Sequence, residues 1–178
     1  MARNWAVFLR GVNVGGHGKV PMAELRKHLP QIGASEVATY IQSGNIVLHH
    51  AAQTRAELAE LIQQLVSDHF GFAPTVLALR HATLKSLLAE IPRPEGVEGK
   101  NIYIYLTDAI FSPDEINALT AHCTQGETLT LLDGALVVVA PQGIGKSKLA
   151  APLERLLDGR ATARNLNSLQ KVQALLEG

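Results

Sequence analysis

Cationic side chains lie beside glycine-rich segments in this chain, and that combination is suited to binding an anion. The first such segment, Gly11–Gly18, contains four glycines and is flanked by Arg10 and Lys19. Glycines let backbone amides approach a ligand closely, and successive amides in such loops form concavities that bind anions. A flexible connection with solvated charges would have the same composition, so the sequence leaves both interpretations open.

The glycine spacing in this segment disfavours a dinucleotide site. The pattern G-x-G-x-x-G is absent, and a dinucleotide fold also needs an acidic residue at the end of the next strand. Here that strand is expected to end at Tyr40–Gln42, where there is no acid.

A second segment, Ala140–Lys148, resembles the phosphate-binding pattern G-x-x-x-x-G-K-[ST] without matching it. Ala140 replaces the first glycine, and Pro141 removes one amide donor. The strand before it is expected to be one arm of a tight hairpin, and no acidic residue is placed to hold magnesium, so a nucleoside triphosphatase is disfavoured. Lys146 and Lys148 beside a helix N-terminus still form a candidate anion site, with Ser147 as a plain helix cap as the alternative.

Two further segments combine polar and cationic residues. Tyr40–Asn45 could contact a ligand through Gln42, Ser43 and Asn45, although a hairpin uses the same residues for its own turn, which we favour. Arg164 and Asn165 precede the last expected helix and could contact an anion or a nucleic acid. Solvent-exposed residues that bind no ligand would show the same sequence pattern.

No arrangement typical of catalysis stands out. The seven histidines are scattered, and the adjacent pair His49–His50 would point to opposite faces of a strand, which makes a poor metal site. Cys123 is expected to pack rather than act as a nucleophile. We therefore name no catalytic residue and expect no metal site and no cofactor, and whether the protein is an enzyme stays open.

The composition is that of an ordinary globular protein. Sixteen basic residues balance sixteen acidic ones, so there is no global positive charge of the kind that nucleic-acid binders usually carry. A single cysteine excludes an internal disulfide and fits a reducing compartment. No signal peptide and no apolar run of membrane-spanning length is found, so we expect a cytoplasmic protein without a membrane partner.

The elements that must position these loops follow one order twice. Strands are expected at Trp5–Leu9, Val37–Ile41, Ile46–Leu48 and Thr75–Leu79, and again around Ile102–Leu106, Leu129–Leu132, Leu136–Val139 and Arg160–Ala163. Helices are expected after Pro21, Thr54, Thr83, Ser112, Lys148 and Asn167. Thr54 with Glu57 and Ser112 with Glu115 match the capping-box pattern, and Asn167 is expected to cap the last helix. Asp133–Gly134 predicts a tight hairpin.

Matching offsets support a structural duplication. Gly44 and Gly134 lie 90 positions apart, and Pro21 and Pro113 lie 92 apart. We predict an α+β protein of two tandem ferredoxin-like (βαββαβ) halves, each an antiparallel sheet with helices on one face. The first half is expected at residues 1–92, and the second half, with a C-terminal helix, at 93–178. If both halves contribute to one site, we expect it where their unlike loops converge, in a cleft between the halves.

Three stretches together resemble the bacterial domain-of-unknown-function family 1697. They are Leu9–Gly16 with Lys19–Met22, Thr39–Asn45, and Gly145–Lys148 with Ala161–Asn165. The resemblance implies two ferredoxin-like halves and no established activity, substrate or cofactor. It implies that the motif residues form a binding surface rather than a core, and Gly44 is among these residues. With Lys146 from the cationic loop, the candidate ligand-binding residues are Arg10, Gly11, Asn13, Gly15, Gly16, Lys19, Gln42, Ser43, Asn45, Lys146, Lys148, Arg164 and Asn165.

Three functions stay open at this point. The first is a module that binds an anionic or phosphorylated ligand, with a small molecule or a nucleic acid as partner. Tyr103 and Tyr105 share one strand face and could stack on bases, or could pack under a helix. The second is an enzyme acting on a small phosphorylated substrate, and the third is a scaffold or dimerising protein without a ligand.

Overall fold

The structure is a computed structural model that describes residues 2–178. The described residues form eight strands: β1 (Trp5–Arg10), β2 (Ser35–Tyr40), β3 (Asn45–His49), β4 (Thr75–Arg80), β5 (Ile102–Thr107), β6 (Thr128–Leu132), β7 (Ala135–Val139) and β8 (Ala161–Asn165). They form six α-helices: α1 (Met22–His28), α2 (Arg55–Phe70), α3 (His81–Glu90), α4 (Pro113–Thr120), α5 (Ala150–Leu157) and α6 (Leu166–Glu177). Short 3₁₀ turns are η1 (Leu29–Ile32), η2 (Gly99–Asn101) and η3 (Ile144–Lys146).

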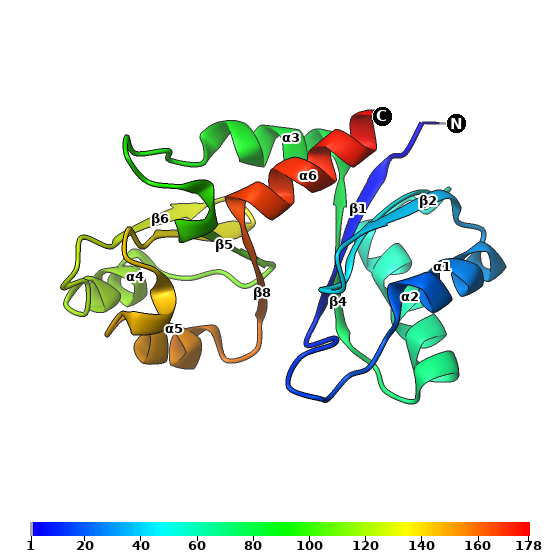
Figure 1. The fold of residues 1–178 in the computed structure, drawn as a ribbon, viewed down its shortest axis with the longest axis horizontal. Helices are drawn as coiled ribbons and strands as arrows, with labels where there is room; N and C mark the ends of the chain where they lie inside the picture. The colour runs from blue at the N-terminus through cyan, green and yellow to red at the C-terminus, as the bar shows by residue number, and fades with distance from the viewer. Residues whose placement is uncertain (1) are drawn as a thin grey trace. The chain divides into compact units, whose positions relative to one another are not determined.

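The strands form two four-stranded antiparallel sheets of one topology. The orders are β2-β3-β1-β4 and β6-β7-β5-β8, so each sheet has its first and third strands in the middle. This is the arrangement of a βαββαβ ferredoxin-like unit, and it confirms the predicted α+β fold with two such halves. In each sheet a helix follows the first strand and another follows the third (Figure 1).

Residue contacts divide the chain into two compact units. Unit 1 comprises Met1–Ser86 and Gln170–Gly178, and unit 2 comprises Leu87–Leu169. The chain passes from one unit to the other within α3 and again within α6.

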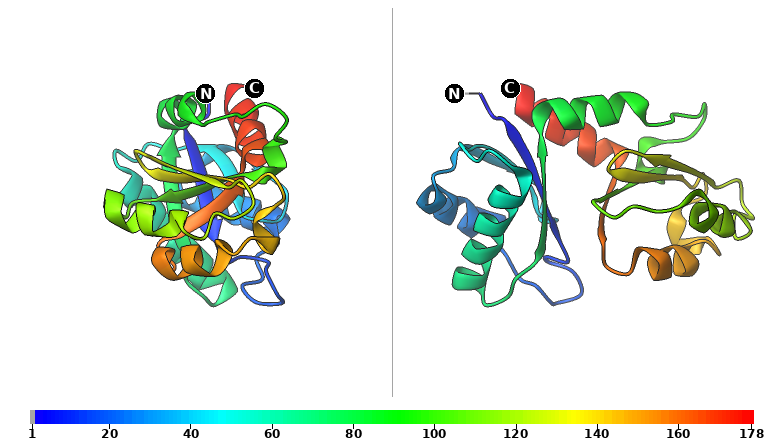
Figure 2. Two further views of the ribbon diagram at one scale, coloured as in Figure 1. Left: turned by 90° about the vertical axis from the view of Figure 1, so that its left-hand side faces the viewer. Right: turned by 180° about the vertical axis from the view of Figure 1, so that it is seen from behind.

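The core of unit 1 lies between its sheet and the helices α1 and α2. Strand side chains alternate between faces, so Trp5, Val7 and Leu9 of β1 point to the same side, where they join the buried leucines of both helices. Both helices lie on one face of this sheet (Figure 2). This packing holds the strands of the sheet in place, and the loops of unit 1 described below lie at the ends of these strands.

Unit 2 has an equivalent core between its sheet and α4 and α5. Leu136 and Val138 of β7 pack with Leu153 of α5. Tyr105 belongs to this core and is only 5% exposed, so of the two alternatives for it, packing under a helix is the one observed. Burial also raises the pKa of the Tyr105 hydroxyl well above its usual range. Tyr105 is therefore not available for stacking on nucleic-acid bases.

The local turn and cap signals were mostly right. Gly134 has a φ of +76° in the two-residue turn between β6 and β7, as predicted. Ser112 and Glu115 form the full capping box, because each side chain accepts a hydrogen bond from the other's backbone N–H. The box predicted at Thr54 is only half formed: Thr54 accepts from Glu57 N, but the Glu57 carboxylate accepts from Gln53 N instead.

One helix start differs from the prediction, and another agrees with it. Helix α6 is capped by Asn165, whose Oδ1 accepts the Ser168 N–H at 2.9 Å, and not by Asn167. Helix α5 begins at Ala150, after Lys148 and the 3₁₀ turn η3. Pro152 then lies in the first helical turn, where its missing N–H costs no helical hydrogen bond.

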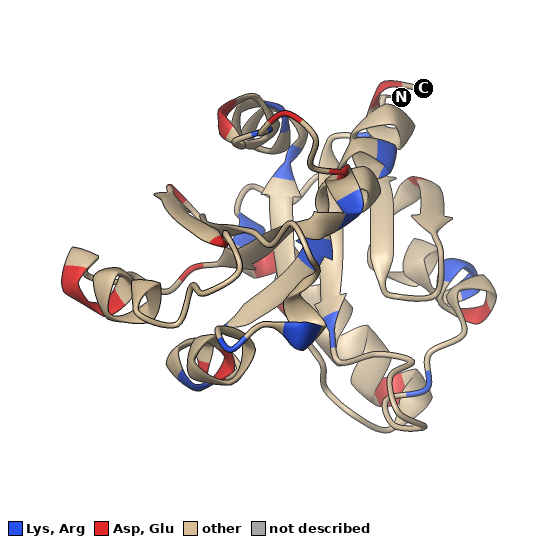
Figure 3. Cartoon of the chain, turned by 60° about the vertical axis from the view of Figure 1, so that its left-hand side comes forward, with Lys and Arg blue, Asp and Glu red and all other residues tan. Residues whose placement is uncertain are grey.

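Charged positions of both signs are interspersed over the helices (Figure 3). Among residues 2–178, none of the helices has the length and the apolar character that crossing a membrane requires.

Candidate functional site

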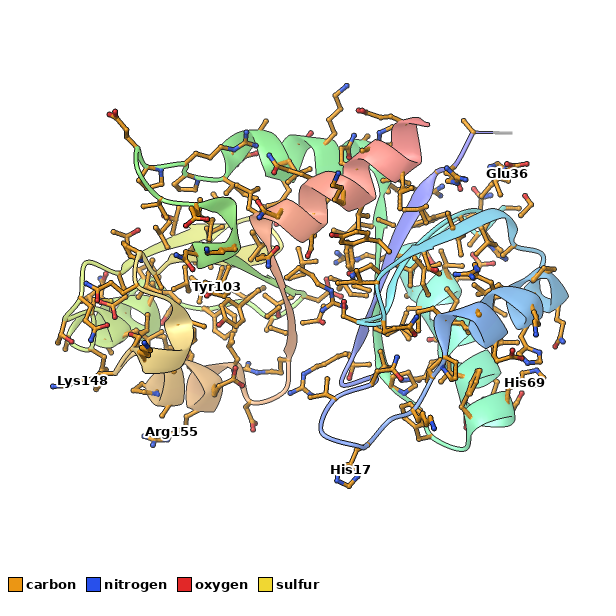
Figure 4. All side chains as sticks on the ribbon, viewed as in Figure 1. His17, Glu36, His69, Tyr103, Lys148 and Arg155 are labelled. Atoms are coloured by element: carbon orange, nitrogen blue, oxygen red, sulfur yellow. The ribbon has the colours of Figure 1, made fainter. Side chains whose placement is uncertain are left out.

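The glycine-rich segment of unit 1 forms a small β-hairpin, Asn13–Gly18, which we call the finger. Val14 and His17 pair across it, and His17 N donates to Val14 O at 3.0 Å. Gly15 and Gly16 at the tip have φ values of +58° and +78°, which a two-residue hairpin turn of this type requires at both central positions. The side chain of His17 points outward from the tip (Figure 4). These two glycines are therefore explained first by the turn that they form.

Asn13 fixes the finger to the rest of unit 1. Its Oδ1 accepts the Val20 N–H at 2.9 Å, and its Nδ2 donates to Val20 O at 2.8 Å. The same Nδ2 donates to Gln42 O at 2.6 Å. Gln42 belongs to the segment Ile41–Gly44 between β2 and β3, which we call the turn. Asn13 thus joins the finger to the turn, across 29 positions of sequence.

Gln42 also supports the start of α1. Its Oε1 accepts the Met22 N–H at 3.2 Å. Pro21 occupies the N-cap position and offers no side-chain acceptor, so Gln42 satisfies one of the amides that the helix start leaves without a partner. The sequence carried no signal for this role, because the two residues are 20 positions apart.

The turn itself is held by Asn45 and Gly44. Asn45 is 1% exposed, and its Nδ2 donates to Tyr40 O at 3.1 Å and to Ser43 Oγ at 2.8 Å. Gly44 O accepts the Leu9 N–H at 2.9 Å. Gly44 has a φ of +79°, and a Cβ added to it would lie 2.7 Å from Leu9 Cβ. These side chains hold the turn together, as the favoured structural interpretation of this segment predicts.

The exposed part of this region combines amide donors, cations and apolar side chains. The backbone N–H groups of Gly15 and Gly16 have no hydrogen-bond partner within the described part of the chain, and a Cβ on either glycine would meet open space. Arg10 at the end of β1 and Lys19 after the finger are exposed. Val14 and Ile41 are exposed apolar residues, at 64% and 52%.

Gly11 connects this region to the sheet. It follows β1 with a φ of +71°, and its carbonyl oxygen lies so close to Gly18 that a Cβ there would overlap it. The predicted residues Arg10, Gly11, Asn13, Gly15, Gly16, Lys19, Gln42, Ser43 and Asn45 therefore lie in one connected region at one end of the unit 1 sheet.

The cationic loop of unit 2 has a different interior. The Ser147 hydroxyl donates to the Glu127 carboxylate, and Ser147 Oγ accepts the Leu149 N–H at 3.0 Å. Both Ser147 and Glu127 are buried, and the hydrogen bond from Ser147 is the main cause of the lowered pKa of Glu127. The negative charge of this carboxylate disfavours phosphate binding to the backbone of the loop. In this respect the loop differs from a phosphate-binding loop of a nucleoside triphosphatase.

Lys146 and Lys148 remain exposed on this loop, and Lys148 points away from unit 2 (Figure 4). Tyr103 of β5 links the loop to β8: its hydroxyl accepts the Ile144 N–H at 3.4 Å, and Asn165 is its cross-strand partner. The loop and Asn165 therefore lie at the same end of the unit 2 sheet.

Arg164 lies on the opposite face of that sheet, because it alternates with Asn165 along β8. It donates to Thr162 Oγ1 at 2.9 Å and to Ala163 O at 2.7 Å. Burial lowers the pKa of Arg164 to about 10, so the guanidinium stays charged at neutral pH.

Groups suited to nucleophilic or metal chemistry are few. Burial raises the pKa of the Cys123 thiol, which makes it a poor nucleophile. Over residues 2–178 there is no cluster of three or more histidine, cysteine, aspartate or glutamate side chains able to hold a metal ion. His50 Nε2 and Nδ1 are both engaged with backbone groups, at Ile32 O and Ala52 N.

Two ferredoxin-like units, with a glycine- and asparagine-containing finger and turn in unit 1, define the class of protein, and a family comparison agrees. The chain belongs to the family described as "Protein of unknown function (DUF1697)", whose model matches residues 2–136. The chain is also similar in fold to a solved structure described as that of the conserved bacterial protein SP0830 from Streptococcus pneumoniae. The TM-score is 0.76, the sequence identity is 23%, and 99% of each chain is covered. No curated protein matches.

Proposed function

We propose that this protein is a cytoplasmic module that binds an anionic, phosphorylated ligand, a nucleotide or nucleic acid among them, through the finger and the turn. The observation that carries the proposal is the clamp by Asn13, which hydrogen-bonds both segments. A backbone held in this way presents the Gly15 and Gly16 amides without an ordering cost on binding, which favours affinity. Phosphate oxygens are suitable acceptors for such amides.

The charges and the apolar side chains fit the same ligand class. Arg10 and Lys19 would make charge-assisted hydrogen bonds to phosphate oxygens, which are stronger than bonds between neutral groups. Val14 and Ile41 are next in sequence to the bonded pair Asn13 and Gln42, so both lie close to the junction of finger and turn. They would contact the less polar part of a nucleotide, such as its sugar or base.

Unit 2, taken by itself, offers separate exposed cations for the same class of ligand. Lys146 and Lys148 would contact phosphate groups through their side chains alone, since Glu127 occupies the interior of their loop. We also retain Arg164 and Asn165 as candidate contacts, with Asn165 already capping α6.

A binding titration tests the proposal. Fluorescent nucleotides and short single-stranded oligonucleotides would be titrated at low salt against the native protein, Arg10→Ala, Lys19→Ala and Lys148→Ala. Each lost charge-assisted contact is expected to weaken binding about tenfold or more. For an oligonucleotide, each lost phosphate contact should also reduce the salt dependence of log K by about 0.7.

Lys171→Ala, which removes one exposed charge from α6, is the matched control and should bind like the native protein. Absence of saturable binding at low salt would contradict the proposal and favour a ligand-free scaffold. Ligand turnover during the titration would instead favour the enzyme hypothesis.

A further inference from the structure

A separate cavity lies in unit 1, away from the finger, between the end of β4 and the start of α2. Its volume is about 160 Å³. It is lined by Trp5, Gln53, Arg55, Ala78, Leu79, Arg80 and Thr83. Trp5 is the first residue of β1 and Arg80 the last of β4, and the two are cross-strand partners. The finger follows the other end of β1, so the two regions lie at opposite ends of this strand.

The polar side chains of this cavity are almost entirely hydrogen-bond donors. Two guanidinium groups, Arg55 and Arg80, and the Thr83 hydroxyl line it, and no carboxylate does. One terminal nitrogen of Arg80 donates to Ala52 O and Gln53 O, at 2.9 and 3.1 Å. No carboxylate partner of Arg80 exists among the residues that the structure describes. Arg80 therefore gives the cavity a positive charge that no carboxylate in the described part of the chain neutralises.

The Arg80 guanidinium is held in place by Trp5. It lies 3.8 Å from the centroid of the Trp5 ring, a cation–π contact. With this contact and the two carbonyl acceptors, the guanidinium is fixed before any ligand arrives. A planar group held this way suits an oxyanion that accepts two parallel hydrogen bonds.

Trp5 also carries a buried donor without a partner. Trp5 is 1% exposed, and its Nε1–H is buried without a hydrogen-bond partner in the described part of the chain. Buried donors nearly always have a partner, and one without a partner is costly and calls for an explanation. Trp5 also lines the cavity, so its indole reports on a ligand bound there.

Helix geometry adds to the donor set. Arg55 is the first residue of α2, a helix of 16 residues, and Thr83 lies in the first turn of α3. The N-terminal ends of helices favour negative charge. Glu57 in the first turn of α2 partly offsets this, but its carboxylate accepts from Gln53 N and is not in the lining.

We propose that this cavity binds a phosphate group through Arg80, Arg55 and Thr83, beside the Trp5 indole. Its size limits the ligand. A cavity of about 160 Å³ is smaller than the roughly 300 Å³ at which small-molecule pockets begin. It therefore holds inorganic phosphate or the terminal phosphate of a small metabolite rather than a whole nucleotide. The site is independent of the finger and would stand if the finger bound nothing.

Trp5 makes the test specific, because it is the only tryptophan in the chain. Its fluorescence, and the single indole N–H cross-peak of a ¹⁵N-labelled sample, both report this cavity. Inorganic phosphate would be titrated against sodium chloride at equal ionic strength. We expect a saturable change in emission and a saturable shift of the indole cross-peak with phosphate, and neither with chloride.

Single substitutions test how much each contact contributes to phosphate binding. Arg80→Met is expected to weaken phosphate binding about tenfold or more, and Thr83→Val by less, since the hydroxyl is neutral. Thr83 is exposed on α3, so Thr83→Val provides a folded variant even if Arg80→Met is unstable. Arg155→Met, which removes an exposed arginine of α5, should bind phosphate normally.

Acetate and methyl phosphate complete the design. Binding of methyl phosphate would extend the site to phosphate monoesters, and equal binding of acetate would overturn the assignment to phosphate. An indole cross-peak that stays unchanged at saturating phosphate would overturn the proposal. So would Thr83→Val and Arg80→Met variants that both respond to phosphate as the native protein does. Loss of the response only in Arg10→Ala would assign phosphate binding to the finger instead.

Discussion

At the scale of single residues, the polar side chains of the finger and the turn act mainly on their own backbone. Asn13, Gln42 and Asn45 hold segments together that are separated in sequence. The sequence predicted that these residues lie in loops and that the turn could use its own side chains. It could not predict the bond from Asn13 to Gln42, because a hydrogen bond across 29 positions depends on the packing of the sheet.

Gly44 provides the sharpest test at this scale. In Gly44→Ala the methyl group would meet Leu9 Cβ at 2.7 Å and Val12 Cγ2 at 2.9 Å, with φ at +79°. The positive φ and the overlap together should lower the free energy of unfolding by about 3 kcal/mol, measured by urea denaturation.

Gly96→Ala is the matched control, because Gly96 has a φ of +76° and open space around it. Only the conformational cost applies there, about 1 kcal/mol. Equal losses in the two variants would show that Gly44 does not approach Leu9 as closely as described.

At the scale of elements, the sequence predicted features that depend on neighbouring residues and missed features that depend on residues far apart in sequence. The Asp133–Gly134 hairpin and the capping box at Ser112 depend on residues within four positions of each other, and both were predicted. Strand β8 extends to Asn165, two residues beyond its predicted end, because Asn165 pairs with Tyr103 of β5. This extension moves the cap of α6 from the predicted Asn167 to Asn165.

The loop before α5 also depends on a residue that is distant in sequence. Glu127 lies 20 positions before Ser147, so no local pattern indicated that its carboxylate holds the loop. The resemblance of Gly145–Lys148 to a phosphate-binding loop is local, whereas the feature that opposes that function is distant.

Glu127 gives a prediction with a defined pH dependence. Its pKa is lowered in the folded state, chiefly by the Ser147 hydroxyl, so the unfolded chain binds the proton more readily. The stabilisation is therefore complete above the usual carboxyl pKa and is lost as the pH falls through the lower folded value. Glu127→Gln should be less stable than the native protein by about 1–2 kcal/mol near neutral pH, and the difference should shrink below about pH 4.

Urea denaturation at a series of pH values measures this difference. Glu60→Gln, a change at an exposed position of α2, should show no comparable trend. A difference for Glu127→Gln that stays constant down to acidic pH would mean that the Ser147 hydrogen bond does not stabilise the carboxylate.

At the scale of the whole molecule, one topology occurs twice with different loops. The two sheets have equivalent strand orders, which the repeated hydrophobic pattern and the matching offsets predicted. In unit 1 the glycine-rich finger follows the first strand, whereas in unit 2 the cationic loop precedes the second helix. These loops therefore occupy topologically different positions in the two units, and the proposed ligand sites of unit 1 have no counterpart of the same sequence in unit 2.

The last residues of the chain belong to unit 1, and this assignment can be tested. Leu176 is buried and lines a hollow with Arg3 and Glu36, while Arg3 donates to Leu175 O at 2.6 Å. Leu176→Ala should destabilise unit 1 by about 2–4 kcal/mol, seen as faster amide exchange in β1 and β3.

Gln170→Ala, at an exposed position of α6, should change stability by less than about 0.5 kcal/mol. If Leu176→Ala left amide exchange in β1 and β3 unchanged, the C-terminal residues would not contribute to the stability of unit 1.

The most direct test of ligand binding by the finger is to observe its tip amides. In a ¹H–¹⁵N spectrum, titration with a nucleotide should move the Gly15 and Gly16 cross-peaks saturably, while that of Gly96, in an open loop of unit 2, stays in place. The shifts should be reduced at equal ligand concentration in Arg10→Ala. Tip amides that do not move at any nucleotide concentration, or that move no more than Gly96, would contradict the proposal that this protein binds a phosphorylated ligand through its glycine-rich finger.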